Sequence, residues 1–389
     1  MVKTPRLLFV LTEDWFFCSH FMDRARFARD NGYKVAVAAR EGNHKEIIQK
    51  EGLEFINIPL TRKSINPITE LLLLLYIFRV YRNFLPDIVH QIGVKPILYG
   101  TVAAYFAGVR AIVNAPIGMG FIFSSDTLLA RLLRPFIKFA YKFSINPKRS
   151  KVVFENHEDC DLFVEWGAVR HSDAVIIPGA GVDLNIFHPF APSNNIAIIV
   201  LMARMLVDKG VIEFVSAARL LRSKGLQARF VLAGSPDPGN PTSISKESLN
   251  NWHLEGCIEY LGWHENVSEL LMTADVVCLP SYREGLPKSL IEACACGLPI
   301  VTTDTVGCRE VVSDGENGFL VPIKSVVPLA DALEKLIKDP SLRRRMGALG
   351  RTRAEKLYDT RKISSSTLEV YSEFIVSRVI GKGISDDQY

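Results

Sequence analysis

The sequence lacks the short signatures of several common enzyme classes. It contains no GxGxxG and no GxxxxGK[ST] pattern, so neither a standard dinucleotide fingerprint nor a P-loop explains a ligand site. Its seven cysteines form no CxxC pair and no Cys/His spacing typical of zinc. We therefore expect no disulfides and no metal site, and we expect a reduced, cytoplasmic protein.

Apolar runs long enough to mark a leader or a membrane span are also scarce. Only about five apolar residues form a run before Thr12, too few for the core of a signal peptide. Residues 96–123 are apolar, but Gly108, Arg110 and Pro116 interrupt them, which favours a buried helix followed by a buried strand. The apolar stretch within residues 67–84 is too short to span a bilayer and is expected to be buried.

Short β-rich runs alternate with helix-like segments along the whole chain. The candidate strands are residues 7–11, 34–39, 54–58, 87–92, 111–114, 151–154 and 174–177, then 196–202, 228–233, 258–261, 276–279, 299–302 and 319–321. Such alternation predicts an α/β fold with parallel sheets and helices on both faces. Ligands of such sheets bind beyond the carboxyl ends of the strands.

Two Gly- and Pro-rich clusters, residues 178–183 and 189–195, separate the two halves and predict a hinge. A chain of 389 residues exceeds one ordinary domain. We expect two doubly wound, Rossmann-like domains that face a central cleft, residues 1–182 and 183–362. Residues 363–389 are expected to form a helix that returns to the first domain, and a tail.

The net charge of +4 is unevenly distributed, since residues 1–190 carry +5 and the remainder carries −1. This basic excess favours an anionic surface, bearing phosphate or lipid, as a partner of the first half. Nucleic acid is rejected as a partner, because the basic residues are not interleaved with a stacking platform and no recognition motif occurs.

The stretch SYREGLPKSLIEACACG, residues 281–297, places Glu284 and Glu292 on either side of a Gly-Leu-Pro turn. Pro287 and Gly297 are typical of the start and the end of a helix. The N-terminus of that helix would bind phosphate, and Glu292 would face a neutral, hydroxyl-rich part of the same ligand. A sugar nucleotide meets both demands. The alternative is that Glu284 caps the helix and Glu292 is a solvated side chain.

A second candidate segment, ARMLVDKG, directly follows the predicted strand 196–202. Arg204 and Lys209 would therefore lie at the carboxyl end of a strand, where a doubly wound sheet binds its ligand. Two cations there could neutralise a diphosphate, and the arginine fork suits bidentate contacts. The alternative is a solvated turn at Lys209-Gly210 before a helix over residues 211–223.

These motifs resemble those of the retaining glycosyltransferases of family 4, which have the GT-B fold. The front of the chain resembles a bacterial branch that builds capsule, O-antigen or glycan chains on lipid carriers. The matching elements cover nearly the whole chain: Trp15-Phe16-Phe17-x-Ser19-His20, Asn31-Gly32-Tyr33, residues 181–189, Arg204 with Lys209-Gly210, Gly234, Leu261-Gly262-Trp263, the Glu284/Glu292 pair and residues 314–321.

The resemblance implies a role for each matching residue of the second domain. Arg204 and Lys209 would bind the donor diphosphate, Glu284 would contact the transferred sugar and be catalytic with them, and Glu292 would bind the ribose. The further donor-binding positions implied are the backbone of Gly285 and Leu286, the loop of Gly262, Trp263 and His264 near the base, and Gly234. The resemblance also implies a retaining, metal-independent transfer without a cofactor. The leading prediction for the donor is a UDP-sugar, with a GDP-sugar as the alternative.

One position departs from the family pattern. Many relatives carry a histidine after the first-domain strand that corresponds to residues 111–114, but this chain reads NAPIGMG there. The polar group that this domain contributes to the cleft is therefore open. Four residues are the candidates for this role or for acceptor contact: His20, His90, Asn114 and Asn156.

The acceptor is expected to be lipid-linked, as a polyprenyl-diphosphate saccharide or a lipopolysaccharide-type glycan. In residues 126–149, basic side chains recur at helical spacing opposite an apolar face rich in phenylalanine. Such a helix fits an anionic membrane surface, which predicts a peripheral protein on the inner face of the cytoplasmic membrane. The expected membrane-facing residues are Arg131, Arg134, Lys138 and Lys142. The alternative is that residues 126–149 form an ordinary helix packed on its own sheet. In another segment, residues 71–75 could help to form an apolar groove for the acceptor.

The leading prediction is thus a glycosyltransferase of bacterial surface polysaccharide or glycan synthesis. Two other classes remain open at this point. One is a nucleotide-sugar epimerase or glycosyl phosphorylase on the same fold, in which no acceptor would be glycosylated. The other is a catalytically silent scaffold at the membrane, against which the intact Glu284, Glu292, Arg204 and Lys209 speak.

Overall fold

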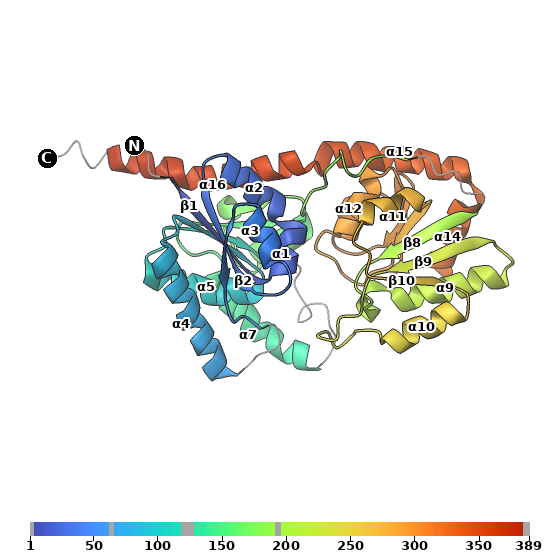
Figure 1. Cartoon of the computed structure of the whole chain (residues 1–389), viewed down its shortest axis with the longest axis horizontal. Helices are drawn as coiled ribbons and strands as arrows, with labels where there is room; N and C mark the ends of the chain where they lie inside the picture. Colours follow the sequence, from blue (N-terminus) through green and yellow to red (C-terminus); the bar gives the residue numbers. More distant parts are fainter. Residues whose placement is uncertain (1–3, 62–65, 118–127, 191–195, 384–389) are drawn as a thin grey trace. The chain divides into compact units, whose positions relative to one another are not determined.

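The computed structural model describes residues 4–61, 66–117, 128–190 and 196–383. The chain divides into two compact units, residues 1–180 with 361–389 and residues 181–360. Each unit is built around one parallel sheet (Figure 1). The chain leaves the second unit at the start of its last helix, so almost all of that helix belongs to the first unit.

The first unit contains a seven-stranded parallel sheet in the order β3-β2-β1-β4-β5-β6-β7. Its strands are β1 (Arg6–Glu13), β2 (Lys34–Arg40), β3 (Glu54–Asn57), β4 (Ile88–Ile92), β5 (Ala111–Ala115), β6 (Ser150–Phe154) and β7 (Ala174–Ile176). Leu7 of β1 pairs with Val35 of β2 on one side and with Ile88 of β4 on the other. The strand order reverses between β1 and β4, as in a doubly wound sheet.

Helices cover both faces of this first sheet. They are α1 (Asp14–His20), α2 (Met22–Asp30), α3 (Lys45–Lys50), α4 (Pro67–Phe84), α5 (Val94–Ala107), α7 (Leu128–Ser144), α8 (His157–Glu165), the short η1 (His171–Asp173) and α16 (Thr360–Gly383). Successive residues of a strand point to opposite faces. Phe9 therefore packs with α1, α2 and α16, whereas Leu8 and Val10 pack with α4 and α5.

The last helix, α16, is tied into the core of the first unit. Val370 and Tyr371 are buried there. The hydroxyl of Tyr371 lies 2.7 Å from Nδ1 of His90 on β4, and the carboxylate of Glu373 lies 3.2 Å from the ammonium of Lys151 on β6. A C-terminal segment that returns to the first sheet thus contributes to that sheet's core.

The second unit contains a six-stranded parallel sheet in the order β10-β9-β8-β11-β12-β13. The strands are β8 (Ala197–Met202), β9 (Ala228–Ala233), β10 (Glu259–Gly262), β11 (Val276–Leu279), β12 (Ile300–Thr303) and β13 (Gly318–Val321). Here the order reverses between β8 and β11, which are neighbours although β9 and β10 separate them in the sequence.

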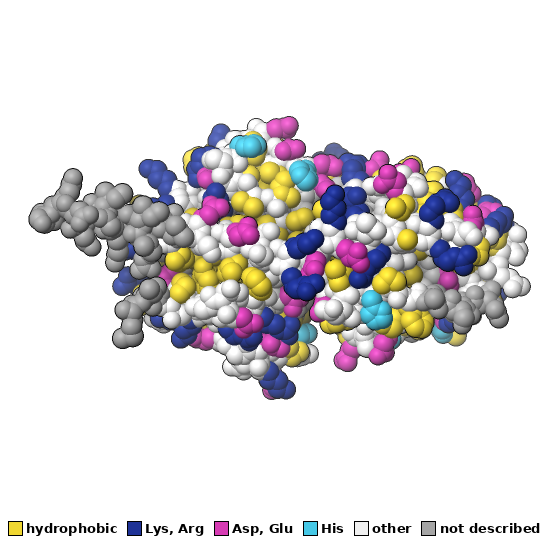
Figure 2. Space-filling view, turned by 90° about the horizontal axis from the view of Figure 1, so that it is seen from above, with side chains coloured by type: hydrophobic (Ala, Val, Ile, Leu, Met, Phe, Trp, Pro, Cys, Tyr) yellow, Lys and Arg dark blue, Asp and Glu magenta, His cyan; other side chains and the backbone are white. Residues whose placement is uncertain are grey.

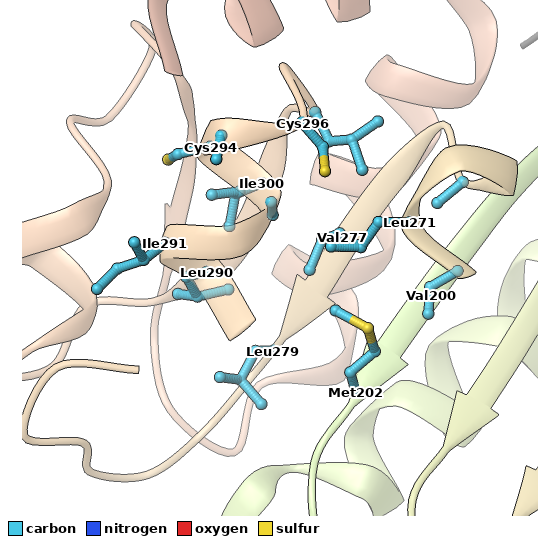
Figure 3. Close-up of a cluster of buried hydrophobic side chains, with 14 of the residues drawn as sticks. Val200, Met202, Leu271, Val277, Leu279, Leu290, Ile291, Cys294, Cys296 and Ile300 are labelled. Atoms are coloured by element: carbon cyan, nitrogen blue, oxygen red, sulfur yellow. The ribbon is translucent and has the colours of Figure 1, made fainter. Parts of the chain in front are cut away.

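Helices also cover both faces of the second sheet. They are η2 (Val207–Lys209), α9 (Val211–Ser223), α10 (Lys246–Leu254), α11 (Val267–Thr273), α12 (Lys288–Ala295), α13 (Cys308–Val311), α14 (Val326–Lys338) and α15 (Pro340–Leu357). One face packs on α9 and α14, the other on α11, α12 and α15. Figure 3 shows Leu290 and Ile291 of α12 in the same buried cluster as Val277 and Leu279 of β11 and Ile300 of β12. This anchoring fixes α12 against the strands that precede it.

The outer surface of α4 differs from the prediction that this run is buried. Leu73 and Ile77 are buried against the first sheet, but Ile68 is 70% and Leu72 is 60% exposed. The expectation is therefore wrong for one face of the helix, because α4 is apolar all round and the sheet covers only one side. None of the described helices combines the length and the hydropathy needed to cross a bilayer. The helix and strand expected within residues 96–123 are observed as α5 and β5, and residues 118–123 lie outside the described part. The strand β5 is buried as expected, but the prediction of a buried helix is wrong for one side of α5, where Tyr105 and Phe106 are exposed.

The distribution of charge on the face of the molecule that Figure 2 shows does not indicate a binding partner. Lys and Arg side chains are interspersed there with Asp and Glu side chains and with apolar groups. Mixed charges of both signs give no extended field of one sign, and salt screens each exposed charge beyond about 10 Å at moderate ionic strength. Surface charge therefore does not locate the functional site, whereas the carboxyl ends of the strands are where doubly wound sheets bind ligands.

Candidate active site

The two candidate segments of the second unit come together because of the strand order. Residues 203–210 follow β8, and residues 280–287 follow β11. Since β8 and β11 are adjacent and parallel, both segments leave the carboxyl edge of the sheet at the point where the order reverses. This is the position at which a doubly wound sheet binds its ligand.

Backbone contacts join these two segments. Gly210 has a left-handed backbone, with φ of 72°, and a Cβ there would lie 2.0 Å from the carbonyl oxygen of Pro280. The carbonyl of Asp208 accepts hydrogen bonds from the amide of Tyr282 at 2.9 Å and from the hydroxyl of Ser281 at 3.0 Å. Only glycine fits such an approach, so Lys209-Gly210 forms a packed turn rather than a solvated one.

Lys209 and Glu284 form an ion pair at this junction. The Lys209 ammonium nitrogen lies 2.5 Å from Oε1 of Glu284, and the two side chains are 20% and 11% exposed. Glu284 therefore does not cap α12, since Pro287 is the N-cap residue and no side chain accepts a hydrogen bond there. An ammonium group carries three donors, so Lys209 can hold Glu284 and still donate to a phosphate oxygen.

Glu292 lies on α12, two turns beyond Glu284 in the same segment. It is 6% exposed, which excludes the alternative of a solvated side chain. Burial raises the pKa of Glu292, and the ammonium of Lys288, 3.4 Å away and one turn earlier, opposes that rise. A desolvated carboxylate of this kind is stabilised by hydroxyl donors, which suits contact with a ribose.

The start of α12 supplies backbone groups to the site. The side chain of Leu286 is buried in the core beneath the segment, so this residue can offer a ligand only its backbone. The first amides of a helix have no partner within the helix. Together with Gly285, this stretch therefore has the geometry expected of an anion site at a helix start.

The segment after β12 supports the Glu284 segment and was missed by the sequence reasoning. Gly307 has φ of 76°, and a Cβ there would lie 2.3 Å from the carbonyl oxygen of Gly285. The hydroxyl of Thr303, at the end of β12, donates to the carbonyl of Ser281. The sequence signal for this contact is Gly307 itself, a glycine that follows the predicted strand 299–302. A glycine by itself does not indicate which segment it contacts.

Arg204 extends the site toward the segment after β9. Its Nη1 lies 2.6 Å from Oδ2 of Asp237, and the two side chains are 40% and 24% exposed. Asp237 was also missed by the sequence reasoning, because nothing local links residues 33 positions apart. The ion pair leaves a substantial part of the guanidinium exposed at the sheet edge.

The other donor-binding positions lie at the ends of β9 and β10. Gly234 has φ of 142°, and a Cβ there would lie 1.8 Å from the carbonyl oxygen of Ala203. Its amide donates to the carbonyl of Gly262 at 2.7 Å. These glycines let the strand ends approach one another. Trp263, next to them, is 70% exposed, and His264 is half-buried. An exposed indole beside a sheet edge suits stacking on a base.

The four candidates of the first unit lie in different places. His90 is buried on β4 and contacts Tyr371. Asn114, buried on β5, donates to the carbonyl of Ile145 at 2.7 Å, and Asn156 accepts from the amide of Asp159 as the N-cap of α8. His20 stacks on Phe16, with ring centroids 4.2 Å apart. All four thus make contacts within the first unit, and their role toward substrate stays a prediction.

The predicted membrane-facing residues lie on α7, which runs through Pro135 without ending. Arg131 and Lys142 are exposed, Arg134 is half-buried, and the ammonium of the exposed Lys138 lies 4.1 Å from the ring centroid of Trp166. Tyr141 of this helix is buried in the core with Val152 and Phe154 of β6, but several other large apolar side chains face solvent. Four of them are 59–72% exposed: Leu132, Phe136, Phe139 and Phe143.

The fold and the site define a class: a protein of two doubly wound units, with a cationic and carboxylate site at the strand ends of the second. Comparison with known proteins identifies the family within this class. Residues 185–353 match the family model described as glycosyl transferases group 1, and residues 6–156 match that described as glycosyl transferase 4-like. The chain belongs to this glycosyltransferase family, with the GT-B fold predicted from its motifs.

Two relatives are named as glycosyltransferases that act on diphospho-undecaprenol acceptors. An N,N'-diacetylbacillosaminyl-diphospho-undecaprenol alpha-1,3-N-acetylgalactosaminyltransferase of Campylobacter jejuni is 30% identical over 370 residues, covering 92% of this chain and 96% of that protein. A UDP-Gal:alpha-D-GlcNAc-diphosphoundecaprenol alpha-1,3-galactosyltransferase of Escherichia coli is 25% identical, covering 73% and 75%. The epimerase, phosphorylase and scaffold alternatives find no support in these relatives.

Solved structures agree with this fold. Anabaena HepE in complex with UDP and glucose superposes with a TM-score of 0.75 at 19% identity, covering 94% of this chain and 99% of that one. Sucrose-phosphate synthase of Thermosynechococcus elongatus superposes with a TM-score of 0.77 at 17% identity, covering 96% and 100%. At these identities the likeness shows the architecture alone. Together with the family membership, it makes this chain a glycosyltransferase of GT-B fold.

Proposed function

We propose that this glycosyltransferase moves a sugar from a UDP-sugar to a saccharide carried on a polyprenyl diphosphate, in the synthesis of a bacterial surface polysaccharide or glycan. The ion pair of Lys209 and Glu284, at the reversal point of the second sheet, carries the proposal, because it sets a cation and a sugar-binding carboxylate side by side. Two relatives named for diphospho-undecaprenol acceptors support the acceptor class.

The chemical step breaks the bond between the sugar and the diphosphate. Negative charge then develops on the departing nucleotide, and its stabilisation lowers the barrier most. Lys209 and Arg204 would donate to the diphosphate, and the backbone at the start of α12 would add further donors. A preorganised donor of this kind contributes about 3 kcal/mol.

The two carboxylates would hold the neutral parts of the donor. Glu284, fixed by Lys209 at 2.5 Å, would accept from hydroxyls of the transferred sugar. Glu292, desolvated on α12, would accept from the ribose. In a front-face reaction the departing phosphate oxygen takes the acceptor's proton, so that the sugar keeps its anomeric configuration without a nucleophile of the enzyme.

A lipid-linked acceptor would place the reaction at the inner face of the cytoplasmic membrane, with the enzyme as a peripheral protein. We assign the first contact with that membrane to α7. Its phenylalanines face solvent instead of the sheet, and its basic residues alternate with them along the helix. Apolar burial at the interface and attraction to anionic lipid would act together.

Nucleotide binding and sugar transfer test the function in sequence. UDP should raise the thermal midpoint of the purified protein more than GDP, ADP or CMP does, with chelator present. UDP-Gal and UDP-GalNAc should then be tried as donors for a synthetic undecaprenyl-diphosphate saccharide, and the anomeric configuration of the product should be read by NMR. A stronger response to GDP, or a product of inverted configuration, would contradict the proposal.

A further inference from the structure

The outer face of α4 is an exposed apolar stripe. Ile68, Leu71, Leu72 and Leu75 are 45–70% exposed, although the same helix buries Leu73 and its neighbours against the sheet. A helix that is apolar all round is normally covered on both sides. Isolated exposed leucines need no explanation, but a contiguous group on one helix indicates a contact surface.

Neighbouring helices extend this stripe. The helices α4 and α5 pack side by side, and α5 also contacts α7, as Figure 1 shows for this side of the first sheet. On α5, Tyr105 is 81% and Phe106 is 70% exposed. With the exposed phenylalanines of α7, the three helices form one layer whose outer side is rich in large apolar groups. We call this layer the α4-α5-α7 face.

A cationic cavity lies at the carboxyl-terminal end of α4. Its volume is about 370 Å³, and it opens where β1, β2 and β3 begin, at the amino edge of the first sheet. The charged residues in its lining are Arg6, Lys34, Arg79 and Glu54. Three cations and one carboxylate leave the cavity with a net charge of +2. Pockets of this size take small ligands or headgroups.

Arg6 lines this cavity, and packing holds its side chain in place. Its Nε is buried and has no hydrogen-bond partner among the described residues. Its guanidinium lies over the ring of Phe84, 4.5 Å from the centroid, so packing holds the side chain in place. The carboxylate of Glu54 lies 3.5 Å from Lys34. Lys34 is therefore paired with Glu54, and the guanidinium groups of Arg6 and Arg79 are the cations suited to a phosphate. The planar fork of a guanidinium group matches the geometry of phosphate oxygens.

The apolar stripe and the cavity lie along one face of α4. Leu72, Tyr76, Arg79 and Asn83 are spaced by four, three and four residues, which places them in one row on a helix. Tyr76, Arg79 and Asn83 line the cavity, whereas Leu72 lies on the stripe. From Leu72 to Arg79 the row covers about 10 Å at 1.5 Å per residue. One end of the row thus suits hydrocarbon and the other suits an anion.

We propose that this cavity binds the phosphate of an anionic membrane phospholipid, whose hydrocarbon lies against the α4-α5-α7 face. The site goes beyond the proposed transfer reaction and does not depend on it, because it lies at the edge of the first sheet where the strands begin. Doubly wound sheets bind substrates at the opposite edge. The cavity would therefore anchor the protein on the bilayer and set its rotation about α7.

The test compares two arginines of the same helix in the full-length protein. Arg79 lines the cavity, whereas Arg82 is exposed on the same last turns and does not line it. Binding to phosphatidylcholine vesicles, with and without phosphatidylglycerol, is measured by flotation for wild type, Arg79→Ala and Arg82→Ala. We expect Arg79→Ala to weaken binding to the anionic vesicles about fivefold to tenfold, and Arg82→Ala to weaken it less than twofold.

A second arm separates lipid from soluble phosphate. Inorganic phosphate and glycerol 3-phosphate are added in thermal unfolding measurements, and UDP stabilisation serves as the fold control for each variant. Equal losses for Arg79→Ala and Arg82→Ala on vesicles would overturn the proposal, because they would indicate diffuse charge attraction. Stabilisation by glycerol 3-phosphate that Arg79→Ala abolishes, with unchanged vesicle binding, would assign the cavity to a soluble ligand and would also overturn it.

Discussion

Lys209 and Glu284 are 75 residues apart in the sequence, yet the ammonium nitrogen of the first lies 2.5 Å from a carboxylate oxygen of the second. They meet because the strands before them, β8 and β11, are adjacent in the sheet. Both side chains are largely buried. Removing one member of such a pair leaves the other charge buried and poorly solvated. A substitution at either residue is therefore expected to affect local stability as well as catalysis.

Replacing Glu284 should remove transfer while the fold is kept. Glu284→Gln retains an oxygen that accepts from Lys209 but loses the charge, and we expect the turnover number to fall about 100-fold or more, the scale of a lost preorganised polar contact. Glu316→Gln, at an exposed position in the same unit, is the matched control. Transfer assays and thermal midpoints are compared. Equal turnover in the two variants would show that Glu284 is not part of the site.

Arg204→Ala should weaken nucleotide binding most. A charge-assisted hydrogen bond is worth about 1.5–3 kcal/mol, so the dissociation constant for UDP should rise about 10- to 100-fold. The control is Arg229→Ala, which breaks a surface pair with Glu259 of 2.8 Å at the opposite edge of the same sheet. Titration calorimetry with UDP measures both. A similar affinity for the two variants would remove Arg204 from the donor site.

The contact between Gly307 and the Glu284 segment can be tested with two glycines. Both Gly307 and Gly315 have left-handed backbones, with φ of 76° and 74°, but a Cβ on Gly315 meets nothing within 4 Å. Gly315→Ala should cost only the backbone strain, about 1 kcal/mol. Gly307→Ala adds a clash with Gly285 and should lower both stability and transfer further.

Urea unfolding and transfer assays of both alanine variants decide this point. Loss of transfer in Gly307→Ala together with retained UDP binding would place the effect on Glu284 positioning. Indistinguishable activity and stability of the two variants would show that the segments after β11 and β12 do not depend on their close contact.

The buried His90 should make stability fall in acid. Burial, and next the nearby Arg24, lower the pKa of His90 to about 3. The unfolded chain binds this proton below about pH 6.5, so it binds more protons than the folded protein, and the free energy of unfolding decreases as the pH falls. Between pH 7.5 and 5.5 this single group should contribute a loss of about 1.4 kcal/mol.

Urea unfolding at the two pH values checks this contribution. His90→Gln removes the titrating group, so its destabilisation relative to wild type should be smaller at pH 5.5 than at pH 7.5 by about 1.4 kcal/mol. His171→Gln, at an exposed position of the same unit, is the control. A pH-independent difference between His90→Gln and wild type would contradict a neutral, buried His90.

The exposed phenylalanines of α7 should matter for membranes and not for folding. Phe136 and Phe139 are 72% and 67% exposed, so changing both to serine should leave the thermal midpoint within about 2 °C of wild type. Vesicle binding should fall about tenfold or more, because each buried apolar side chain contributes about 1.5–3 kcal/mol. Ile212→Ser, at an exposed position of α9, is the control. Unchanged flotation of the double variant would reject docking through α7.

Much of this architecture follows from the sequence alone. The alternation of short apolar strands with helical segments predicts two parallel sheets, because a parallel connection requires a crossover segment. The positions of Arg204, Lys209 and Glu284 just after predicted strands place them at a sheet edge. Local pattern suffices for these conclusions, since each depends on neighbours within a few residues.

Tertiary structure alone decided which of these segments meet. The order β10-β9-β8-β11 brings Lys209 to Glu284, and no local signal encodes that order. The partner of Arg204, the desolvation of Glu292 and the contact of Gly307 with Gly285 likewise depend on distant segments. The outward face of α4 is a further case, because an apolar helix pattern does not say whether one or two of its sides will be covered. Periodicity is a property of a segment, whereas burial depends on everything that packs around it.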